Sequence, residues 1–310
     1  MDTVDVLMSI YKPDKVYLIK QLKSIDEQTY KNITLYVYND CPSERIDKEL
    51  FKEHIHYPIV FLETDGENRG FIKAFEKLIN ESKGKYVAFC DQDDIWKKDK
   101  IEKCVGTLKK DKSLAVATDR SIINENDEVK IQSVRETVNK NYENWMTGDD
   151  ICKYDLVICF AVGMCLVADG DFARSTCPIS EFSGHDQWLL ACASTEGKVS
   201  FINEPLVMYR RHDHNVSGVM NDVKSKKQYY EKRVLAQKKM YEDFFKKYPN
   251  HKDKDEMMDF VEKRMNHSTI GLLRYRYLAP DVVKFEIVLS LVPNFIFKFL
   301  RFVARRLSRI

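Results

Sequence analysis

The sequence predicts an α/β fold, in which a doubly wound and mostly parallel sheet is flanked by helices. Two observations carry this prediction: short apolar runs alternate with segments of helical periodicity, and the chain is long enough to bury a core. Strands that alternate with helices of this length imply right-handed crossovers between parallel strands. The 310 residues, of which 44% are hydrophobic, and the mean hydropathy of −0.43 exclude a collagen, a disordered chain and a multispan membrane protein.

The expected elements follow one another from the first strand onward. A strand is expected at residues 4–10, and a helix follows it because apolar residues recur from Val16 to Ile25 at helical spacing. The next elements are strands at 33–38 and 58–62, a helix at 70–82, a strand at 86–90, a helix at 98–110 and a strand at 114–118. The pattern loosens beyond Asp119, and the polar stretch through Asn144 is interpreted as irregular or mobile. The core is completed by apolar runs at 156–161 and 163–168, a helix at 186–194 and strands at 199–202 and 206–209.

Residues 219–310 differ from the rest of the chain in charge. They contain 21 Lys and Arg against 11 Asp and Glu, whereas residues 1–218 contain 29 against 37. The sequence therefore predicts an acidic domain at 1–218 and a basic helical extension at 219–310. The extension begins with a long charged helix at 222–247, which is expected to pack one aromatic stripe on the core and ends before Pro249. The net charge of the whole chain is only +2 and no nucleic-acid-binding motif is present, so no nucleic-acid partner is expected.

The end of the extension predicts a surface contact. Charged residues and Pro293 interrupt the apolar runs at 282–291 and 295–303, so a transmembrane helix is not expected. A helix from Phe295 onward would separate apolar from basic side chains, which is typical of a helix lying on an anionic membrane. The alternative is a helix packed on the protein or on a second subunit of a homodimer. The apolar face would hold Ile296, Phe299, Val303, Leu307 and Ile310, and the basic face Lys298, Arg301, Arg305 and Arg309.

The N-terminus and the cysteines indicate a reducing compartment. The chain begins with an acidic segment that has no charged n-region and no small-residue cleavage site, which favours an unprocessed, cytoplasmic protein. The eight cysteines are scattered without a CxxC pair, and most lie in apolar runs. We therefore expect buried free thiols rather than disulfides or a cysteine-based zinc site.

Polar side chains follow the first four expected strands at the point where each strand ends. In a parallel sheet, ligands bind outside the carboxyl ends of the strands, so these residues are expected to share one rim. They are Ser9 and Tyr11, Asn39 and Asp40, Thr64 and Asp65, and the group Asp91, Gln92, Asp93 and Asp94.

The segment FCDQDDIW is the most informative, because it places three carboxylates within four residues at the end of a buried strand. Their mutual repulsion is costly unless a cation lies between them. Mg²⁺ and Mn²⁺ are usually held by one or two carboxylates together with substrate phosphates, which a nucleoside diphosphate would supply. The alternative is that Asp93 or Asp94 caps the following helix.

The segment ENRGFIKAFEKLI opens a helix with Asn68, Arg69 and Gly70. The N-terminal amides of such a helix bind anions, and Arg69 or Lys73 would add positive charge. The alternative is that these residues only cap the helix.

Two further motifs place titratable groups after turns. In FSGHDQWLL, His185 and Asp186 begin a helix, and a carboxylate there either caps the helix or accepts a proton from a bound hydroxyl. In YRRHDHNVSG, basic residues follow a strand, which favours contact with an anion or a metal over a purely structural role. This second group consists of Arg210, Arg211, His212, His214 and Asn215.

Together these motifs resemble the inverting family 2 glycosyltransferases of the GT-A fold, and the resemblance covers residues 4–218. The ordered set is SIYKP, NDC, NRG, DQDDIW, GHDQW and YRRHDHNVSG. More narrowly, FCDQDDIW and the final motif look like the rhamnosyltransferase branch that builds bacterial cell-wall and surface polysaccharides. The processive-synthase motif QxxRW is absent, which favours addition of one or a few sugars.

The resemblance implies a role for each matching position. Asp186 would be the catalytic base, Asp93 a metal ligand, Asp91 a ribose contact and His212 a group near the diphosphate and metal. The departure Asp213-His214 leaves open whether His212 or His214 lies on the metal side. The nucleotide-sugar site would comprise Ser9, Tyr11, Asp40, Asn68, Arg69, Gly70, Lys73, Asp91, Gly163, Met164, His185 and Arg211.

The implied activity is a metal-dependent single displacement that uses Mg²⁺ or Mn²⁺. The donor would be a nucleoside-diphosphate sugar, with L-rhamnose from dTDP-rhamnose as the first expectation, and the acceptor a saccharide or lipid-linked saccharide. The protein would work peripherally on the inner face of the plasma membrane. The alternatives are a UDP-hexose or UDP-N-acetylhexosamine donor, and a catalytically silent nucleotide-sugar-binding scaffold.

Overall fold

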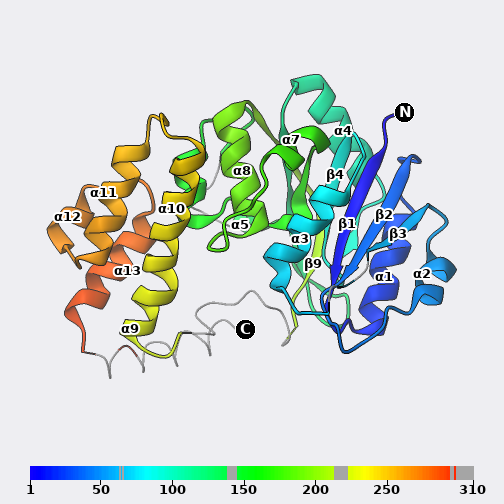
Figure 1. Ribbon diagram of the computed structural model, residues 1–310, viewed down its shortest axis with the longest axis horizontal. Coiled ribbons are helices and arrows are strands. Elements are labelled where there is room, and N and C mark those ends of the chain that lie inside the picture. Colours follow the sequence, from blue (N-terminus) through cyan, green and yellow to red (C-terminus); the bar gives the residue numbers. More distant parts are fainter. Residues whose placement is uncertain (63, 65, 138–144, 213–222, 294–296, 298–310) are drawn as a thin grey trace. The chain divides into compact units, whose positions relative to one another are not determined.

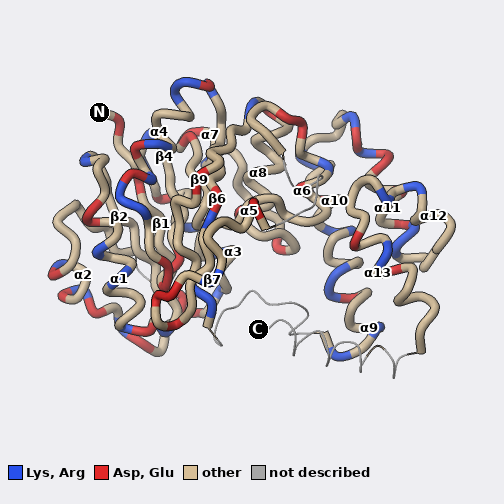
Figure 2. The backbone as a smooth tube through the Cα atoms, turned by 180° about the vertical axis from the view of Figure 1, so that it is seen from behind, with Lys and Arg blue, Asp and Glu red and all other residues tan. Residues whose placement is uncertain are grey.

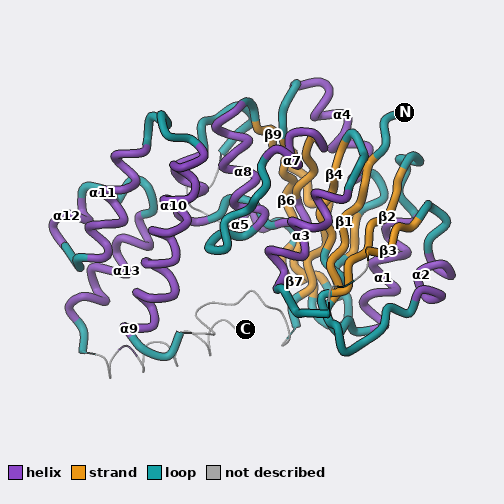
Figure 3. The backbone as a smooth tube through the Cα atoms, viewed as in Figure 1, coloured by secondary structure: helices purple, strands orange, loops and turns teal. Residues whose placement is uncertain are grey.

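The computed structural model describes residues 1–62, 64, 66–137, 145–212, 223–293 and 297. The chain forms two compact units (Figure 1). An α/β unit comprises residues 1–155 and 159–212, and a helical unit comprises residues 156–158 and 213–310. Figure 3 shows the strands gathered in the first unit and helices α9 to α13 in the second. The domain boundary expected after Gly218 lies outside the described residues.

One sheet forms the centre of the α/β unit, in the order β3-β2-β1-β4-β8-β6-β9-β5, with β7 paired to β6. Strands β3, β2, β1 and β4 are parallel neighbours, whereas β8 is antiparallel to both β4 and β6. The predicted α/β class is confirmed, and the sheet is mixed in its second half. The strands are β1 Val4–Ile10, β2 Ile33–Asn39, β3 Ile59–Leu62, β4 Tyr86–Cys90, β5 Ile95–Trp96, β6 Ala115–Ile123, β7 Val129–Ile131, β8 Leu166–Asp169 and β9 Val199–Arg210.

Helices flank this sheet, and a capping side chain explains where the first of them begins. The side chain of Asp14 caps the first helix by accepting from the amides of Val16 and Tyr17 at 2.8 and 3.1 Å. The helices are α1 Lys15–Asp26, α2 Lys48–His54, α3 Gly70–Glu81, α4 Lys100–Asp111, α5 Val134–Thr137, α6 Cys152–Ile158, α7 Gly170–Ser175 and α8 His185–Glu196. A short 3₁₀ turn, Gly163–Cys165, precedes β8.

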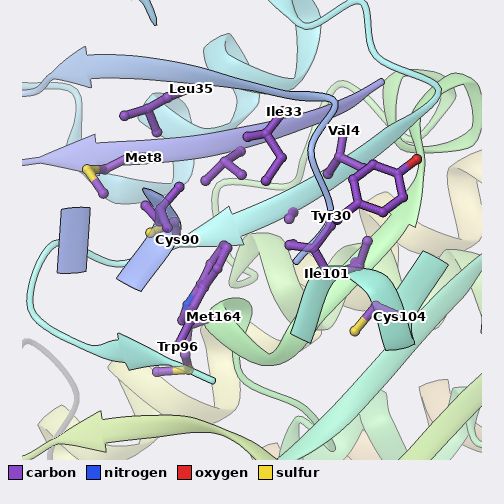
Figure 4. Packing of buried hydrophobic residues seen from close by; sticks show 14 of the residues in the cluster. Val4, Met8, Tyr30, Ile33, Leu35, Cys90, Trp96, Ile101, Cys104 and Met164 are labelled. Carbon is purple, nitrogen blue, oxygen red and sulfur yellow. The ribbon is translucent and has the colours of Figure 1, made fainter. Parts of the chain in front are cut away.

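The core of the α/β unit follows from the period-2 pattern of its strands. Alternate residues of β1, from Val4 to Ile10, pack in one cluster with the apolar stripe of α1. Figure 4 shows part of this core, where side chains of β1, β2 and β4 pack together with Trp96 and Ile101. All eight cysteines are free, and six of them are buried, as expected.

The interpretation of residues 119–144 as irregular is wrong for the described part of that stretch. Strand β6 continues through Asp119 to Ile123, and β7 and α5 follow it. The carboxylate of Asp119 is buried, and it accepts from the hydroxyl of Ser133 at 2.5 Å and the amide of Arg135 at 3.1 Å. This part of the strand was not predicted because a charged residue, Asp119, interrupts its apolar pattern. The two short strands expected at 199–202 and 206–209 form one strand, β9, whose register against β6 shifts around Asp119.

The helical unit contains a long first helix, as the sequence predicts. Helical structure runs without a break from Lys226 to Lys247, although Tyr230–Leu235 takes π-helical form. Figure 2 shows both signs of charge along the helices of this unit. Apart from Phe297, the helix expected from Phe295 onward lies outside the described residues. The elements are α9 Lys226–Tyr229, α10 Ala236–Lys247, α11 Lys254–Met265, α12 Thr269–Leu273 and α13 Pro280–Leu291.

Within the described ranges, no helix has the length and apolar content needed to cross a membrane.

Candidate active site

The carboxyl ends of β1, β2 and β4 meet at one edge of the sheet, because the three strands are parallel neighbours. The amide of Asp40 donates to the carbonyl of Ile10 at 2.9 Å. The amide of Tyr11 donates to Gln92 Oε1 at 2.8 Å, and Gln92 Nε2 donates back to the carbonyl of Tyr11 at 3.1 Å. The loops after the three strands are thus joined by hydrogen bonds. Ser9 lies on β1 opposite Tyr38, and Asp65 lies outside the described residues.

The NRG segment is tied to this edge through Asp40. Asp40 is 4% exposed, and its Oδ1 accepts from the amide of Arg69 at 2.9 Å. Asn68 Oδ1 accepts from the amide of Gly70 at 3.0 Å, and Gly70 has a φ of +76°, which favours glycine. Helix α3 has no side-chain cap, so the alternative that Asn68, Arg69 and Gly70 only cap the helix is not observed. Lys73 pairs with Glu76, with Nζ 3.1 Å from Oε1.

Two carboxyl groups of the acidic loop, residues 91–94, have a raised pKa: those of Asp91 and Asp94. The pKa of Asp91 is raised to about 7, first by burial and then by the negative charges of Asp93 and Asp186. Asp93 and Asp186 therefore lie close to Asp91, although Asp186 begins a distant helix. The side chain of Asp94 is fully buried, and its Oδ1 accepts from the amide of Arg210 at 2.9 Å. Helix α4 begins after Asp99 without a side-chain cap, so Asp93 and Asp94 do not cap it.

The end of β9 returns to the acidic loop. The ring of His212 lies with Nε2 2.7 Å from Asp93 Oδ2, across 119 residues of sequence. Arg210 is fully buried and donates from Nε to the carbonyl of Asp93 at 2.8 Å. The ring of Tyr17 on α1 stacks on His212 with centroids 5.5 Å apart, and the guanidinium of Arg210 lies 4.4 Å from the same ring. Asp127 pairs with Arg210 at 2.6 Å and also with Lys20.

Of the remaining residues in the YRRHDHNVSG motif, Arg211 lies within the described part of the chain. Arg211 has an exposed side chain, and its amide donates to the carbonyl of Ile123 at 2.9 Å. Asp213, His214 and Asn215 lie outside the described residues. The structure therefore describes His212 beside Asp93 and leaves the alternative His214 untested.

Asp186 is the second residue of α8. Its Oδ2 accepts from the amide of Gly163 at 3.1 Å, and its Oδ1 accepts from the amide of Gln187 at 2.9 Å. The neighbouring His185 is 5% exposed, and burial lowers its pKa. Met164 is 3% exposed and packs in the hydrophobic core, so its side chain stabilises the Gly163–Cys165 turn from inside.

The donor set suits a cation that takes most of its ligands from a substrate. Within the described ranges, no group of three or more His, Cys, Asp and Glu side chains is arranged to hold a metal ion. Asp93 and His212 form a close pair, with Asp91 near them. Mg²⁺ is typically held by one or two carboxylates and by phosphate oxygens, so this arrangement fits such an ion together with a diphosphate.

Two residues of this site, Tyr17 and Asp127, were not identified from the sequence. Gln92 was counted among the polar strand ends, but its bridge to the backbone of Tyr11 depends on the register of β1 and β4. Tyr17 belongs to the helical pattern of α1 and carries no local signal of a contact with His212. Asp127 lies in the β6–β7 turn, inside the stretch interpreted as irregular.

Comparisons with known proteins match this architecture. Residues 5–168 match the family Glycosyl transferase family 2. The "Putative teichuronic acid biosynthesis glycosyltransferase TuaG" of Bacillus subtilis (strain 168) is 33% identical over 105 residues, which are 31% of this chain and 40% of that protein. The "dTDP-rhamnosyl transferase RfbG" of Shigella flexneri is 24% identical over 274 residues, which are 83% of this chain and 88% of that protein. The chain thus spans less than half the length of TuaG.

The fold is similar to that of a solved structure, "S. aureus TarS 1-349 in complex with UDP". The TM-score is 0.58 at 12% sequence identity, and the match covers 84% of this chain and 71% of that one. At this identity the likeness concerns the fold alone.

Proposed function

The chain belongs to glycosyl transferase family 2 and has the GT-A fold, and on that premise we propose that it transfers a sugar from a nucleoside-diphosphate donor to a saccharide acceptor. One feature supports this most directly: the negative charges of Asp93 and Asp186 both raise the pKa of Asp91, although Asp186 lies on a helix far from the loop in sequence. A transferase of this kind needs one acidic group for the diphosphate side and another for the acceptor.

In the proposed reaction, Asp186 is the general base. Its carboxylate removes the proton of an acceptor hydroxyl while that oxygen forms a bond to the anomeric carbon of the donor. The bond from the anomeric carbon to the diphosphate breaks at the same time, the diphosphate leaves with the electron pair, and the anomeric configuration inverts. The amides of Gly163 and Gln187 each donate to Asp186, which fixes the orientation of the carboxylate.

The remaining residues are proposed to bind the donor. Asp93 and His212 would hold the Mg²⁺ or Mn²⁺, and Asp91 would contact the ribose. A bound divalent cation supplies positive charge that stabilises the departing diphosphate. Asp40 keeps the NRG segment at the same edge, where the nucleotide would lie. Ser9, Tyr11, Arg69 and Arg211 belong to the same proposed site.

The proposed donor is dTDP-rhamnose, and the proposed context is the synthesis of a bacterial polysaccharide. The similarity to RfbG supports the donor, because it extends over 83% of the chain. The similarity to TuaG supports the context. A UDP-hexose or UDP-N-acetylhexosamine is the alternative donor, because no described residue excludes it.

We also propose that the extension attaches the protein to an anionic membrane, where a lipid-linked acceptor would lie. Ile270 and Leu291 are 82% and 75% exposed, and residues 219–310 carry ten more positive than negative charges. Flotation with neutral vesicles and with vesicles containing anionic lipid tests this proposal. Equal absence of binding to both, or a dimer that buries the extension, would contradict it.

The decisive experiment compares Asp186→Asn with the unmodified protein. Transfer is measured with dTDP-rhamnose, UDP-glucose, UDP-galactose and UDP-N-acetylglucosamine, each with and without Mn²⁺. Loss of the base should lower kcat by about 10²- to 10⁴-fold. The rise in melting temperature on adding nucleotide and Mn²⁺ should be retained.

The matched control is Asp171→Asn, because the side chain of Asp171 is 79% exposed and contacts Arg174 on its own helix. It should leave kcat unchanged. Retained transfer in Asp186→Asn would remove Asp186 from the mechanism. Lost nucleotide affinity would place it in the donor site instead.

A further inference from the structure

His185 is buried without a polar partner. Neither ring nitrogen has a hydrogen-bond partner within the described part of the chain, and burial lowers the pKa of the ring, which favours the neutral form. The ring stacks on Phe75 at 3.9 Å between centroids and lies 5.1 Å from Phe89. A buried nitrogen without a partner costs free energy, so a purely apolar residue would suit packing alone better. Packing against Phe75 and Phe89 alone therefore does not explain a histidine at this position, and its other contacts must be considered.

The ring of His185 touches the backbone of Gly163. A Cβ atom added at Gly163 would lie 2.5 Å from His185 Nε2, closer than real Cβ atoms come to other atoms, and 3.0 Å from Cε1. Gly163 is not among the residues with positive φ, so its backbone conformation would by itself accept alanine. The glycine is required because the imidazole occupies the space of a side chain.

The same glycine holds the carboxylate next to His185. The amide of Gly163 donates to Asp186 Oδ2 at 3.1 Å. The Gly163–Cys165 turn therefore contacts the first two residues of α8 through Gly163. The Cα of Gly163 lies against the ring of His185, and the N–H of Gly163 donates to the carboxylate of Asp186. If the ring were absent or displaced, the distance between this N–H and the carboxylate would no longer be fixed.

We propose that His185 is a positioning residue: its imidazole sets the separation between the Gly163–Cys165 turn and helix α8, so that the Gly163 amide orients the carboxylate of Asp186. This inference rests on the proposed role of Asp186 as the base. This role replaces the expectation that His185 contacts the donor directly, because the ring is enclosed by Phe75, Phe89 and Gly163. Misplacing the base changes the chemical step more than donor binding, so kcat should respond and the donor KM should not.

The test is a double-mutant cycle between positions 163 and 185, measured as kcat and donor KM on the full chain. Gly163→Ala should lower kcat by about 100-fold with little change in KM, because the added methyl pushes the turn away from α8. Adding His185→Ala should restore kcat by about tenfold over Gly163→Ala, because the methyl then fills part of the space of the ring. Gly106→Ala is the matched control, since nothing lies within 4 Å of a Cβ at that position; it should leave kcat and KM unchanged.

A second measurement does not depend on transfer. Hydrogen exchange of the Gly163 amide should be faster in His185→Ala than in the unmodified protein, and melting temperature with UDP and Mn²⁺ verifies that each variant folds. Normal kcat in Gly163→Ala, or no recovery in the double variant while both fold, would overturn the proposal. Unchanged exchange at Gly163 in His185→Ala would overturn it as well. If no donor is turned over but exchange rises, the proposed function fails and the positioning contact stands.

Discussion

The two units bury charged side chains in opposite ways. In the helical unit, Arg264 and Glu286 are 4% and 1% exposed, and they form an ion pair with each other. Arg264 Nε donates to both carboxylate oxygens at 3.0 Å, and Nη2 donates at 2.6 Å. The hydroxyl of Tyr229 donates to the same carboxylate at 2.7 Å. In the acidic loop of the α/β unit, three carboxyl groups lie within four residues, and burial and the neighbouring negative charges raise the pKa of Asp91 and Asp94.

This difference separates a structural charge cluster from a binding site. A buried ion pair whose hydrogen bonds are satisfied by the chain itself has no capacity left for a ligand. Carboxyl groups that repel one another destabilise the free protein, and a cation with its diphosphate would remove that repulsion. The comparison therefore predicts that substitutions in the two regions change stability with opposite signs.

The largest effect is expected in the helical unit. Glu286→Leu leaves the guanidinium of Arg264 buried without its partner, so we expect a loss of about 3–5 kcal/mol of unfolding free energy in urea titrations. The matched variant Arg264→Met combined with Glu286→Leu removes both charges and should recover most of that loss. A double variant as unstable as the single one would show that shape, rather than charge, decides the stability of this cluster.

The acidic loop should respond in the opposite direction. The pKa of Asp91 is raised from 3.8 to about 7 in the folded protein, so the folded state binds its proton more tightly than the unfolded state between these pH values. Without ligand, stability therefore falls as pH rises through this window, and Asp91→Asn removes that loss. At pH 8 the variant should melt a few degrees above the unmodified protein, by the usual relation between free energy and melting temperature.

The same variant should lose function. The rise in melting temperature on adding nucleotide and Mn²⁺ should disappear in Asp91→Asn, and the difference in stability from the unmodified protein should vanish near pH 4. An Asp91→Asn variant that is less stable than the unmodified protein at pH 8 would contradict the inference that repulsion among these carboxylates destabilises the folded protein.

The sequence predicted the acidic loop but not the Arg264 cluster, and the reason is physical. Asp91, Asp93 and Asp94 are neighbours in sequence, so their repulsion is visible without a fold. Arg264 and Glu286 are separated by 22 residues in a charged segment, and only the packing of α11 with α13 distinguishes them from solvated residues. Similarly, strand ends such as Asp40 followed from periodicity, whereas the contact of Tyr17 with His212 depends on how α1 lies on the sheet.

The smallest effect is expected where the charges of the α/β unit are paired and partly exposed. Lys20 and Asp127 form an ion pair with side chains 35% and 34% exposed, while Asp127 keeps its second contact, with Arg210. Lys20→Met should therefore cost no more than about 0.5 kcal/mol in urea titrations, because solvent and salt screen such a pair. The difference should shrink further at 1 M salt. A loss of unfolding free energy as large as that of Glu286→Leu would mean that exposure does not govern the contribution of these ion pairs to stability. The contacts of Asp127 would then stabilise the end of β9, and with it His212 beside the acidic loop, more strongly than their geometry indicates.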